Sequence, residues 1–509
     1  MPSCALVDYT GEWDDSNARA LLRATASAGR RVAGLAFGNE LVTDKGIEAR
    51  LSAAAYARDV VRFGSLVRTI WPLQSGHSPL LLAPDVQYMD DSWMSAFLHE
   101  LWPPLPSAAP VGVTPASSSG KTAQEAISAA GDGDESERLA PPPVDALTHH
   151  MYPLGASAEL GQRNLRSKLI DPRRLDQQIV ERLHLAERLV LNRTRRQARL
   201  FVSETGGAYN SGQAGVTDAF GSSFWWLALL GELGRHSHDV ACRQTLVGGR
   251  YALVDLRRRD LAPDFWSTLL WRRLVSPKVL RSARLSKAPA HEAAIAVRTD
   301  VGGAVSADGG AGESGGASVG SAADTAADAA GPGASSTARP PPPPSESRLR
   351  SYAFCARATA SDVNVAGGIV VLLLNLSPES TQEVTLELGG LRAAMEDTSD
   401  PNGTQTSRLD FVLTAPSLAS RIVSLNGRPL QLLADGSIPA LEGEPHVGRT
   451  MRLPPLSIAY YAFPEAQNAQ CFTQDQLTER KRAAKGGSEK GKRAKKLWAK
   501  LASAKKGRA

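Results

Sequence analysis

The feature that most constrains the fold of this 509-residue chain is a regular alternation of strand-like and helix-like segments in its first half. Short apolar runs that end at turn-forming residues alternate with longer stretches in which apolar residues recur every three or four positions. This alternation predicts a parallel sheet built from β/α units. Strands are expected at 4–8, 32–37, 80–83, 144–153, 199–202 and 241–246, and helices at 17–27, 48–69, 92–101, 173–198, 220–233 and 264–274.

Six such units fall short of a closed barrel, because a (β/α)8, or TIM-type, barrel needs eight. The chain begins in mid-pattern, with a strand that starts almost at Met1. We therefore expect the first two units to be the missing ones. The predicted fold class is an α/β barrel of the TIM type that lacks its first two β/α units.

The second half of the chain has a different pattern. Two low-complexity insertions, 103–143 and 300–347, are too rich in small residues and Pro to bury a core of their own. Beyond the second insertion, short strands predict an antiparallel β-sandwich. These strands are expected at 351–357, 368–376, 383–388, 420–425 and 457–463. The predicted organisation is a barrel domain over 1–276, a sandwich domain over 277–467 and a basic tail over 468–509.

The basic charge of the chain is confined to its C-terminal tail. Between Arg480 and Ala509 there are 13 Lys and Arg residues against one acidic residue, so this segment carries +12. The formal net charge of the whole chain is +6, which leaves −6 for the remainder. We expect a solvated tail, with attraction to an anionic glycan or a membrane surface as its functional alternative. No specific nucleic-acid partner is expected.

The four cysteines show no spacing suited to a metal. Cys355 and Cys471 flank the β-rich region, so a disulfide between them is compatible with an oxidising compartment. Sequons at Asn192, Asn375 and Asn402 point weakly the same way. No apolar run reaches the roughly 20 residues of a membrane span. The first residues do not have the pattern of a signal peptide.

Two glutamates stand where predicted strands end. The stretch Phe201–Tyr209 carries an apolar lead-in, then Glu204, then small and turn-forming residues. The stretch Val32–Glu40 has the same construction and ends in Gly-Asn-Glu. Barrels of this type place their chemistry at the carboxyl ends of their strands. Glycoside hydrolysis needs two carboxylates, one as acid/base and one as nucleophile or base. The pattern therefore predicts a glycoside hydrolase.

Several short motifs occur in a defined order over about residues 4–276. They are Trp13–Ala18, Gly38–Glu40, Pro84–Val86, Thr148–Tyr152, Ser203–Thr205 with Ala208-Tyr209, Arg243-Gln244 and Tyr251–Asp255. Taken together, they resemble heparanase and the plant heparanase-like proteins of glycoside hydrolase family 79. No single motif is decisive, whereas the ordered set is specific. The likeness continues more loosely over about residues 349–466.

The resemblance implies a retaining β-glucuronidase with a (β/α)8 barrel, a C-terminal β-sandwich and no cofactor. It assigns the acid/base to Glu40, the nucleophile to Glu204, and a hydrogen bond to the sugar 2-hydroxyl to Asn39. The Gly-rich turn after Glu204 would offer N–H groups to a uronate carboxylate. Cys355 and Cys471 fall where the family forms a disulfide. The residues that would line the sugar subsite are His150, Tyr152, Tyr209, Gln244 and Tyr251.

Two features depart from the family pattern. Leu41 follows the acid/base, where the family usually has Pro. The first two β/α units are expected to be missing, together with an N-terminal strand that family members add to the sandwich. The chain would then be an incomplete gene model, whose missing start also held the signal peptide, or a decayed or partner-completed enzyme.

The expected substrate is a polysaccharide or proteoglycan glycan that contains β-linked glucuronic acid. The expected location is extracellular, in the cell wall, or lysosomal or vacuolar by way of the secretory pathway, with membrane association as an option. The runner-up function is a non-catalytic glycan-binding relative. No third ligand is placed beside His149 and His150, so no metal site is predicted. Trp225-Trp226 is predicted to pack a helix against the barrel rather than to bind sugar.

Overall fold

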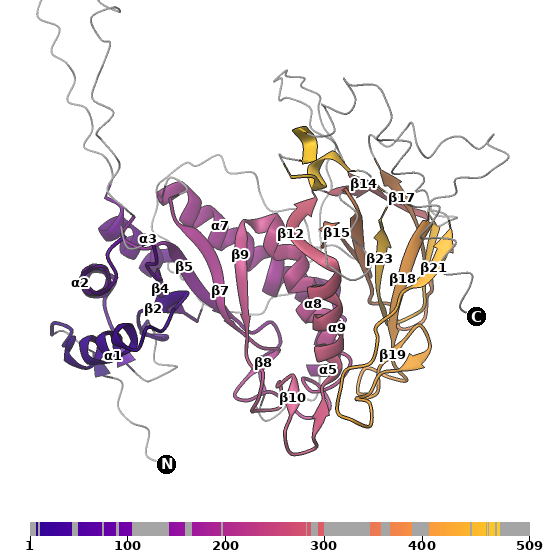
Figure 1. Cartoon of the computed structure of the whole chain (residues 1–509), viewed down its shortest axis with the longest axis horizontal. Helices are drawn as coiled ribbons and strands as arrows, with labels where there is room; N and C mark the ends of the chain where they lie inside the picture. Colours follow the sequence, from indigo (N-terminus) through magenta and orange to yellow (C-terminus); the bar gives the residue numbers. More distant parts are fainter. Residues whose placement is uncertain are drawn as a thin grey trace, which may run out of the picture.

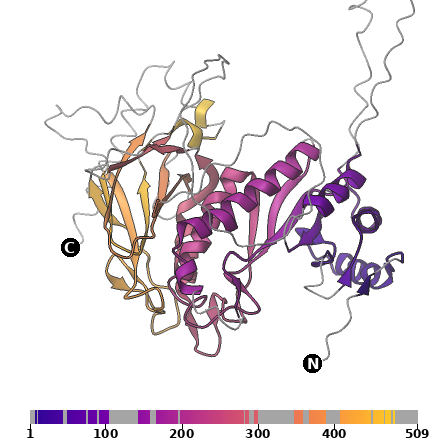
Figure 2. The same ribbon diagram turned by 180° about the vertical axis from the view of Figure 1, so that it is seen from behind.

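The computed structural model shows an α/β domain followed by antiparallel β-sheets, with two helices between them (Figures 1 and 2). Most of both predicted insertions and most of the basic tail lie outside the described residues. The residues that the structure describes are 7–8, 11–42, 49–73, 76–87, 91–103, 142–157, 165–194, 197–280, 282–286, 294–299, 347–357, 367–388, 407–447, 450–464, 466, 468–473 and 476–478.

The α/β domain is built on a curled, five-stranded sheet in which all neighbouring strands are parallel. The sheet is open in the described part of the chain. Its strands, in spatial order, are β2 (Gly34–Ala36), β4 (Leu80–Val86), β5 (Ala146–Met151), β7 (Arg199–Thr205) and β9 (His238–Arg243). The prediction of a parallel β/α arrangement is therefore confirmed.

The predicted count of six sheet strands is wrong for the described residues. Strand β1 (Val7–Asp8) pairs in parallel with β3 (Ala49–Arg50), in a separate two-stranded sheet. It does not join β2. The apolar residues predicted as a barrel strand therefore form a local pair with β3 instead. An eight-stranded barrel that lacks its first two units stays a prediction.

Helices follow the strands of the parallel sheet. In α2, Ser52 caps the helix by accepting a hydrogen bond from the Ala55 N–H at 3.2 Å. The helices of this domain are α1 (Ser16–Ser27), α2 (Ala53–Ile70), α3 (Asp91–Leu101), α5 (Leu165–Lys168), α6 (Pro172–Leu175), the π-helix η2 (Asp176–Val180), α7 (Glu181–Arg193), α8 (Ser222–Leu233), the 3₁₀ helix η3 (Gly234–His236) and α9 (Pro263–Leu274).

Two small sheets lie in the loops at the carboxyl ends of the parallel strands, near the lower edge of Figure 1. Strand β6 (Gly155–Ala156) pairs in parallel with β8 (Ala208–Tyr209). Strand β10 (Val254–Asp255) pairs in antiparallel fashion with β11 (Asp260–Leu261). Both pairings hold loops that reach the candidate site described below.

The C-terminal half forms two further sheets, mostly antiparallel as predicted, apart from a parallel β14–β17 pair. The first has the order β12-β15-β16-β23-β18-β19-β20, with β21 paired to β18, and the second has the order β13-β14-β17-β22. Their strands are β12 (Val275–Leu280), β13 (Ser282–Ser286), β14 (Ala294–Thr299), β15 (Leu349–Ala356), β16 (Ile369–Asn375), β17 (Gln382–Leu388), β18 (Ser407–Thr414), β19 (Ser424–Leu425), β20 (Arg428–Pro429), β21 (Glu444–Val447), β22 (Thr450–Leu453) and β23 (Ser457–Phe463).

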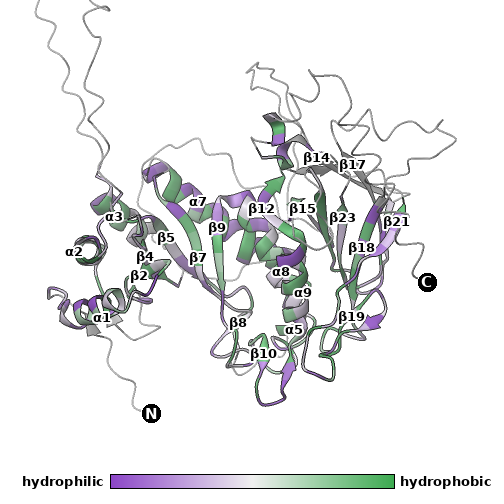
Figure 3. Cartoon of the chain, in the orientation of Figure 1, coloured by the Kyte–Doolittle hydropathy of each residue, from purple (hydrophilic) through white to green (hydrophobic). Residues whose placement is uncertain are grey.

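Helices α8 and α9 join the two halves through one hydrophobic core. Figure 3 shows apolar residues where these helices meet the sandwich strands. Trp225 and Trp226 are 0% and 3% exposed within this core, which confirms their predicted packing role. The Tyr460 hydroxyl donates to the Ser267 carbonyl at 2.9 Å across the junction. The junction is therefore a packed interior rather than a flexible hinge.

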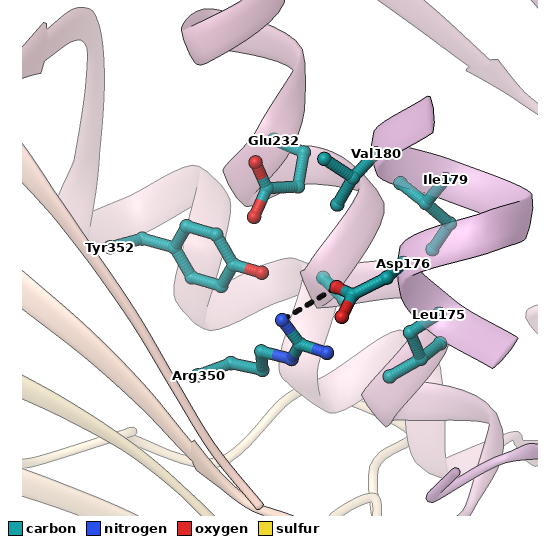
Figure 4. Close-up of a pocket in the computed structure, with 8 residues that line it drawn as sticks. Leu175, Asp176, Ile179, Val180, Glu232, Arg350 and Tyr352 are labelled. Carbon is teal, nitrogen blue, oxygen red and sulfur yellow. Dashed lines mark ion pairs between the residues drawn. The ribbon is translucent and has the colours of Figure 1, made fainter. Parts of the chain in front are cut away.

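The pocket in Figure 4 lies at this junction, and its lining includes the charged side chains of Asp176, Glu232 and Arg350. Arg350 of β15 forms an ion pair with Asp176 of η2, with 2.7 Å between Nη1 and Oδ1. The pocket shares no residue with the candidate active site, and this ion pair connects the two halves across it.

Cys355 and Cys471 form a disulfide with 5.3 Å between their Cα atoms, as predicted. The Asn375 sequon is different from what the sequence indicates. Its side chain is fully buried, and its amide donates to the carbonyls of Ser380 and Pro454, both at 2.8 Å. Asn375 is therefore closed to glycosylation in the folded chain. Among the described residues, no helix has the length and apolarity to cross a membrane.

Candidate active site

The carboxyl ends of the five parallel strands bring most of the predicted site residues together. Glu40 follows β2, His150 and Tyr152 lie at the end of β5, Glu204 lies near the end of β7, and Gln244 follows β9. One carboxylate oxygen of Glu40 and one of Glu204 lie within 4.8 Å of each other, with His150 beside both. Residues separated by up to about 200 positions thus form one polar cluster at the edge of the sheet.

The loop that carries Glu40 has an unusual backbone. Glu40 has a φ of +54°, in a region that non-glycine residues rarely adopt, and its N–H donates to the Asp85 carbonyl at 2.9 Å. Gly38 has a φ of +79°, and a Cβ there would lie 2.6 Å from the Tyr56 hydroxyl. The fully buried Tyr56 contacts the carbonyls of both Phe37 and Pro84 through that hydroxyl. Tyr56 therefore holds the loop that follows β2 against the last residues of β4.

His150 lies at the centre of three carboxylates. Its Nδ1 is 2.7 Å from Glu40 Oε1 and 3.9 Å from Glu204 Oε2. Its Nε2 is 3.4 Å from Asp85 Oδ1, which is an ion-pair distance rather than a well-formed hydrogen bond. Its side chain is 1% exposed. A buried imidazole in contact with this much negative charge is held in its protonated form.

The pKa values follow from this arrangement. Burial acts to lower the pKa of His150, but its contacts with Asp85 and Glu40 outweigh burial and raise the pKa to about 9. Burial acts to raise the pKa of Glu40, but hydrogen bonds from His150 and Gln87 outweigh it and lower that pKa. The Gln87 amide donates to Glu40 Oε2 at 2.8 Å. At rest, the site therefore contains an imidazolium beside an ionised Glu40.

Glu204 is held from its other side by Tyr152. The Tyr152 hydroxyl donates to Glu204 Oε1 at 2.5 Å and also contacts the side-chain amide of Gln244. One hydroxyl carries one proton, so it can donate to only one of these groups. If the Gln244 amide is turned so that its NH2 faces Tyr152, all three groups are satisfied. Glu204 then accepts the hydrogen bond from the Tyr152 hydroxyl.

The two remaining tyrosines line the same space. Tyr209 lies edge-on to Tyr152, with 6.1 Å between ring centroids. A Cβ at Gly206 would meet the rings of Tyr152 at 2.9 Å and Tyr251 at 3.3 Å, so only glycine fits between them. Burial, and then the charge of Glu204, raise the pKa of Tyr251.

A buried ion pair supports this wall from beneath. Arg243 Nη2 lies 2.5 Å from Asp264 Oδ2 and donates to the Tyr251 carbonyl at 3.1 Å. The guanidinium of Arg243 also stacks over the Trp225 ring, 4.7 Å from its centroid. The pair thus connects the end of β9 to helices α8 and α9 and fixes the backbone beside Gln244.

The structure places Asn39 differently from the other predicted residues, because its side chain is exposed next to Glu40. Three residues with no predicted role also belong to the site: Asp85, Gln87 and Tyr56. Asp85 and Gln87 come at the end of a predicted strand. Polar residues at that position in a parallel sheet are candidate site residues, so they could have been predicted from the sequence. Tyr56 is an aromatic residue on the apolar face of a helix, which sequence alone cannot distinguish from ordinary core.

His149 and His150 separate completely. His149 Nε2 lies 3.0 Å from His238 Nε2, and His238 Nδ1 donates to the His236 carbonyl at 2.6 Å. His238 therefore accepts at Nε2, and His149 donates. Glu40, His150 and Glu204 have the donor types of a metal site. A ligating imidazole must be neutral, however, and the surrounding carboxylates favour protonated His150.

Comparisons with known proteins find a family model and several relatives that match this chain. A model of the "Glycosyl hydrolase family 79, N-terminal domain" matches residues 4–105 and 137–231. Heparanase-like protein 1 of Arabidopsis thaliana is 27% identical over 484 residues, covering 91% of this chain and 69% of that protein. Baicalin-beta-D-glucuronidase of Scutellaria baicalensis is 26% identical, covering 89% and 63% respectively. Inactive heparanase-2 of Mus musculus is 25% identical, covering 51% and 34%.

By its fold and its paired carboxylates, the chain is an α/β protein of the glycosidase type. Over residues 4–105 and 137–231 it matches the N-terminal domain of glycosyl hydrolase family 79, and most of its length is similar to heparanase-like proteins. The chain spans about two thirds of the length of the two plant relatives.

Proposed function

We propose that the chain hydrolyses β-linked glucuronic acid in a polysaccharide or proteoglycan glycan, with retention of configuration at the anomeric carbon. One observation carries the proposal: oxygens of Glu40 and Glu204 lie within 4.8 Å of each other. Carboxyl groups roughly 5–5.5 Å apart are typical of retaining enzymes, whereas inverting enzymes need roughly 6.5–9.5 Å to admit a water. The short separation favours direct attack by one carboxylate.

In the first step, Glu204 attacks the anomeric carbon while the bond to the leaving oxygen breaks. Tyr152 donates to Glu204 at 2.5 Å, which orients the nucleophile. Glu40 protonates the leaving oxygen. In the second step, Glu40 removes a proton from water, and the water oxygen displaces Glu204 from the sugar.

The first step needs a proton on Glu40, although contact with His150 lowers the pKa of this residue. His150 Nδ1 lies 2.7 Å from Glu40 Oε1 and can supply that proton directly. The transfer leaves a neutral imidazole and a carboxylic acid, so the two groups titrate as one pair. We propose that His150 donates its proton to Glu40 before Glu40 protonates the leaving oxygen.

The sugar is proposed to bind against Tyr152, Tyr209, Tyr251 and Gln244, with the Gly206-Gly207 turn facing the uronate carboxylate. The baicalin-beta-D-glucuronidase among the relatives supports a glucuronide as substrate. The chain is further proposed to act in a secretory or extracellular compartment, where a disulfide such as Cys355–Cys471 persists.

The test is trapping with a 2-fluoro glucuronide, followed by mass spectrometry of the digested protein. A glycosyl adduct on the peptide that contains Glu204 is expected, and Glu204→Gln should abolish it. Glu379→Gln, which alters an exposed glutamate between β16 and β17, is the matched control and should leave labelling unchanged. An adduct on another residue, or labelling that survives Glu204→Gln, would contradict the assignment.

The second candidate is a glycan-binding protein without turnover. The ion pair between His150 and Glu40 favours it, because an acid/base that stays ionised cannot protonate a leaving group. The inactive heparanase-2 among the relatives supports it as well. Under this alternative, glucuronide oligosaccharides bind in a calorimeter, but neither product nor adduct forms.

A further inference from the structure

A second cluster of potential metal ligands lies on the helix layer, away from the candidate active site. His184 and Glu187 are one turn apart on α7, and His236 ends η3. One ligand atom of each lies within 4.8 Å of the other two, and all three side chains are half-buried. Positions three apart on a helix face the same way, so α7 presents two ligands together to the turn between α8 and β9.

The carboxylate of this cluster is already oriented by a neighbour. Ser237 Oγ donates to Glu187 Oε1 at 2.6 Å, while Glu187 Oε2 faces His236 Nδ1 at 3.4 Å. Carboxylates that ligate metals are typically hydrogen-bonded in this way through groups outside the coordination shell. Ser237 therefore turns one oxygen of Glu187 toward the imidazole nitrogen beside it.

The imidazole of His236 has its own partner on the opposite edge. Its Nε2 lies 3.7 Å from Oε2 of Glu232, a carboxylate only 5% exposed. Glu232 is held by Arg235 at 3.1 Å, and it lies beside Tyr352 in Figure 4. A metal-bound histidine usually donates a hydrogen bond from its other ring N–H to such a carboxylate. Binding through Nδ1 would leave Nε2 facing the Glu232 carboxylate at an ion-pair distance.

We propose that His184, Glu187 and His236 bind a zinc-type transition-metal ion, with water as the fourth ligand. Two histidines and one glutamate form a ligand set that zinc accepts in tetrahedral geometry. Bonds of about 2.0–2.2 Å put tetrahedral ligand atoms roughly 3.3–3.5 Å apart. The Glu187–His236 contact of 3.4 Å already meets that spacing, and the ligand atom of His184 lies within 4.8 Å of both.

The bound ion would tie helix α7 to the turn that leads into β9. This turn leads into β9, which ends at Arg243, immediately before Gln244 in the wall of the active site. The ion would lie among the helices rather than beside Glu40 and Glu204, so its effect is on stability rather than on chemistry. A ligand that binds only the folded state raises the unfolding temperature by mass action.

The test is titration of the full chain, prepared without a histidine tag and stripped with EDTA, with zinc chloride in a calorimeter. Cobalt(II) serves as the spectroscopic probe of tetrahedral coordination. One equivalent of metal should bind and raise the unfolding temperature. His184→Ala and His236→Ala should weaken binding by at least about a hundredfold, and Ser237→Ala by roughly tenfold.

Two controls keep the experiment decisive. The Glu40→Gln/Glu204→Gln double variant should bind zinc as tightly as the wild type, which separates this cluster from the active-site one. His446→Ala, a half-exposed histidine on β21, should also leave binding unchanged. If His236→Ala does not fold, Glu187→Gln keeps the shape of the side chain and serves in its place. Absence of zinc binding, or binding insensitive to these ligand variants, would overturn the proposal.

Discussion

His149 and His150 are consecutive residues of β5, yet they lie in opposite environments on the two faces of one strand. His150 faces the carboxyl edge of the sheet, where Glu40, Glu204 and Asp85 raise its pKa to about 9. His149 is paired with His238 in the interior. Burial, followed by the charges of neighbouring histidines, lowers the pKa of His149 well below its usual value.

The difference teaches that burial alone does not set the charge of a side chain. Both imidazoles are almost completely inaccessible, with 2% and 1% exposure. The neutral His149 has a neutral hydrogen-bond partner, and the charged His150 has carboxylates. On β5, His149 therefore packs in the interior, whereas His150 belongs to the candidate active site. The following predictions test that contrast, beginning with the largest expected effect.

Removing the carboxylate of Glu40 or Glu204 should reduce catalytic activity and leave the interior face of β5 almost unchanged. Glu204→Gln should reduce kcat/KM by at least about a thousandfold, which corresponds to roughly 4 kcal/mol. Glu40→Gln should cause a comparable loss on glycans but retain much of the first step with a nitrophenyl glucuronide, whose leaving group needs no acid. Steady-state kinetics on both substrates measure the split. Equal losses on both substrates in Glu40→Gln would contradict the acid/base assignment.

The two faces should respond to pH in opposite directions. The pKa of His150 is raised from 6.5 to about 9 in the folded state. Protonated His150 therefore contributes its full stabilisation of the folded chain below about pH 6.5, and this contribution is lost as the pH rises toward 9. The stability deficit of His150→Gln relative to the wild type should therefore shrink by about 3 kcal/mol across this window. Urea denaturation at several pH values measures it. A deficit that does not change with pH would contradict the charged assignment.

On the interior face, burial lowers the pKa of His238 from 6.5 to about 4. A base that is neutral when folded contributes stability above about pH 6.5, and this is lost as pH falls toward 4. As the pH falls over that range, the free energy of unfolding of His238→Gln should therefore decrease by about 3 kcal/mol less than that of the wild type. Urea denaturation between pH 4 and 7 checks this, and an unchanged acid slope would contradict it.

Gly38→Ala should damage the loop that carries Glu40. The backbone has a φ of +79°, and the new Cβ would meet the Tyr56 hydroxyl at 2.6 Å. We expect a stability loss of about 2–3 kcal/mol from strain and displacement together. Activity should fall roughly tenfold or more, because Glu40 shifts. Thermal unfolding and kinetics measure the two effects.

Gly436→Ala is the matched control for this substitution. Gly436 has the same φ of +79°, but its Cβ would meet nothing within 4 Å. It should therefore lose only about 1 kcal/mol, from backbone strain, and keep full activity. If both variants behaved alike, the contact with Tyr56 would not position Glu40.

Tyr152→Phe should lower activity with little effect on stability. It removes the hydroxyl that donates to Glu204 at 2.5 Å while keeping the ring against Tyr209. We expect kcat to fall by about 10–100-fold, or roughly 1.4–2.7 kcal/mol, with little change in unfolding temperature. Kinetics alongside thermal unfolding separate these outcomes. A large loss of stability with unchanged kcat would make Tyr152 a structural residue instead.

Much of the architecture could be predicted from local patterns. Apolar runs that end at turn residues located the strands that lead to Glu40, His150 and Glu204, because strand ends in a parallel sheet meet at one edge. The strand predicted at 4–8 was placed in the wrong sheet, since a short apolar run does not specify its partner. Strands β12, β13, β14, β18, β20, β21 and β22 of the C-terminal sheets were missed, because weak alternation of apolar and polar residues does not distinguish a strand from a loop.

The sequence by itself determined which chemical groups are present and which strand ends carry them. Only the tertiary structure decided their state. It placed His150 between carboxylates and His149 against His238, brought Asp85, Gln87 and Tyr56 to Glu40, and buried the Asn375 sequon. The physical reason is that pKa and accessibility depend on groups distant in the chain, which meet only when five strands align at one edge.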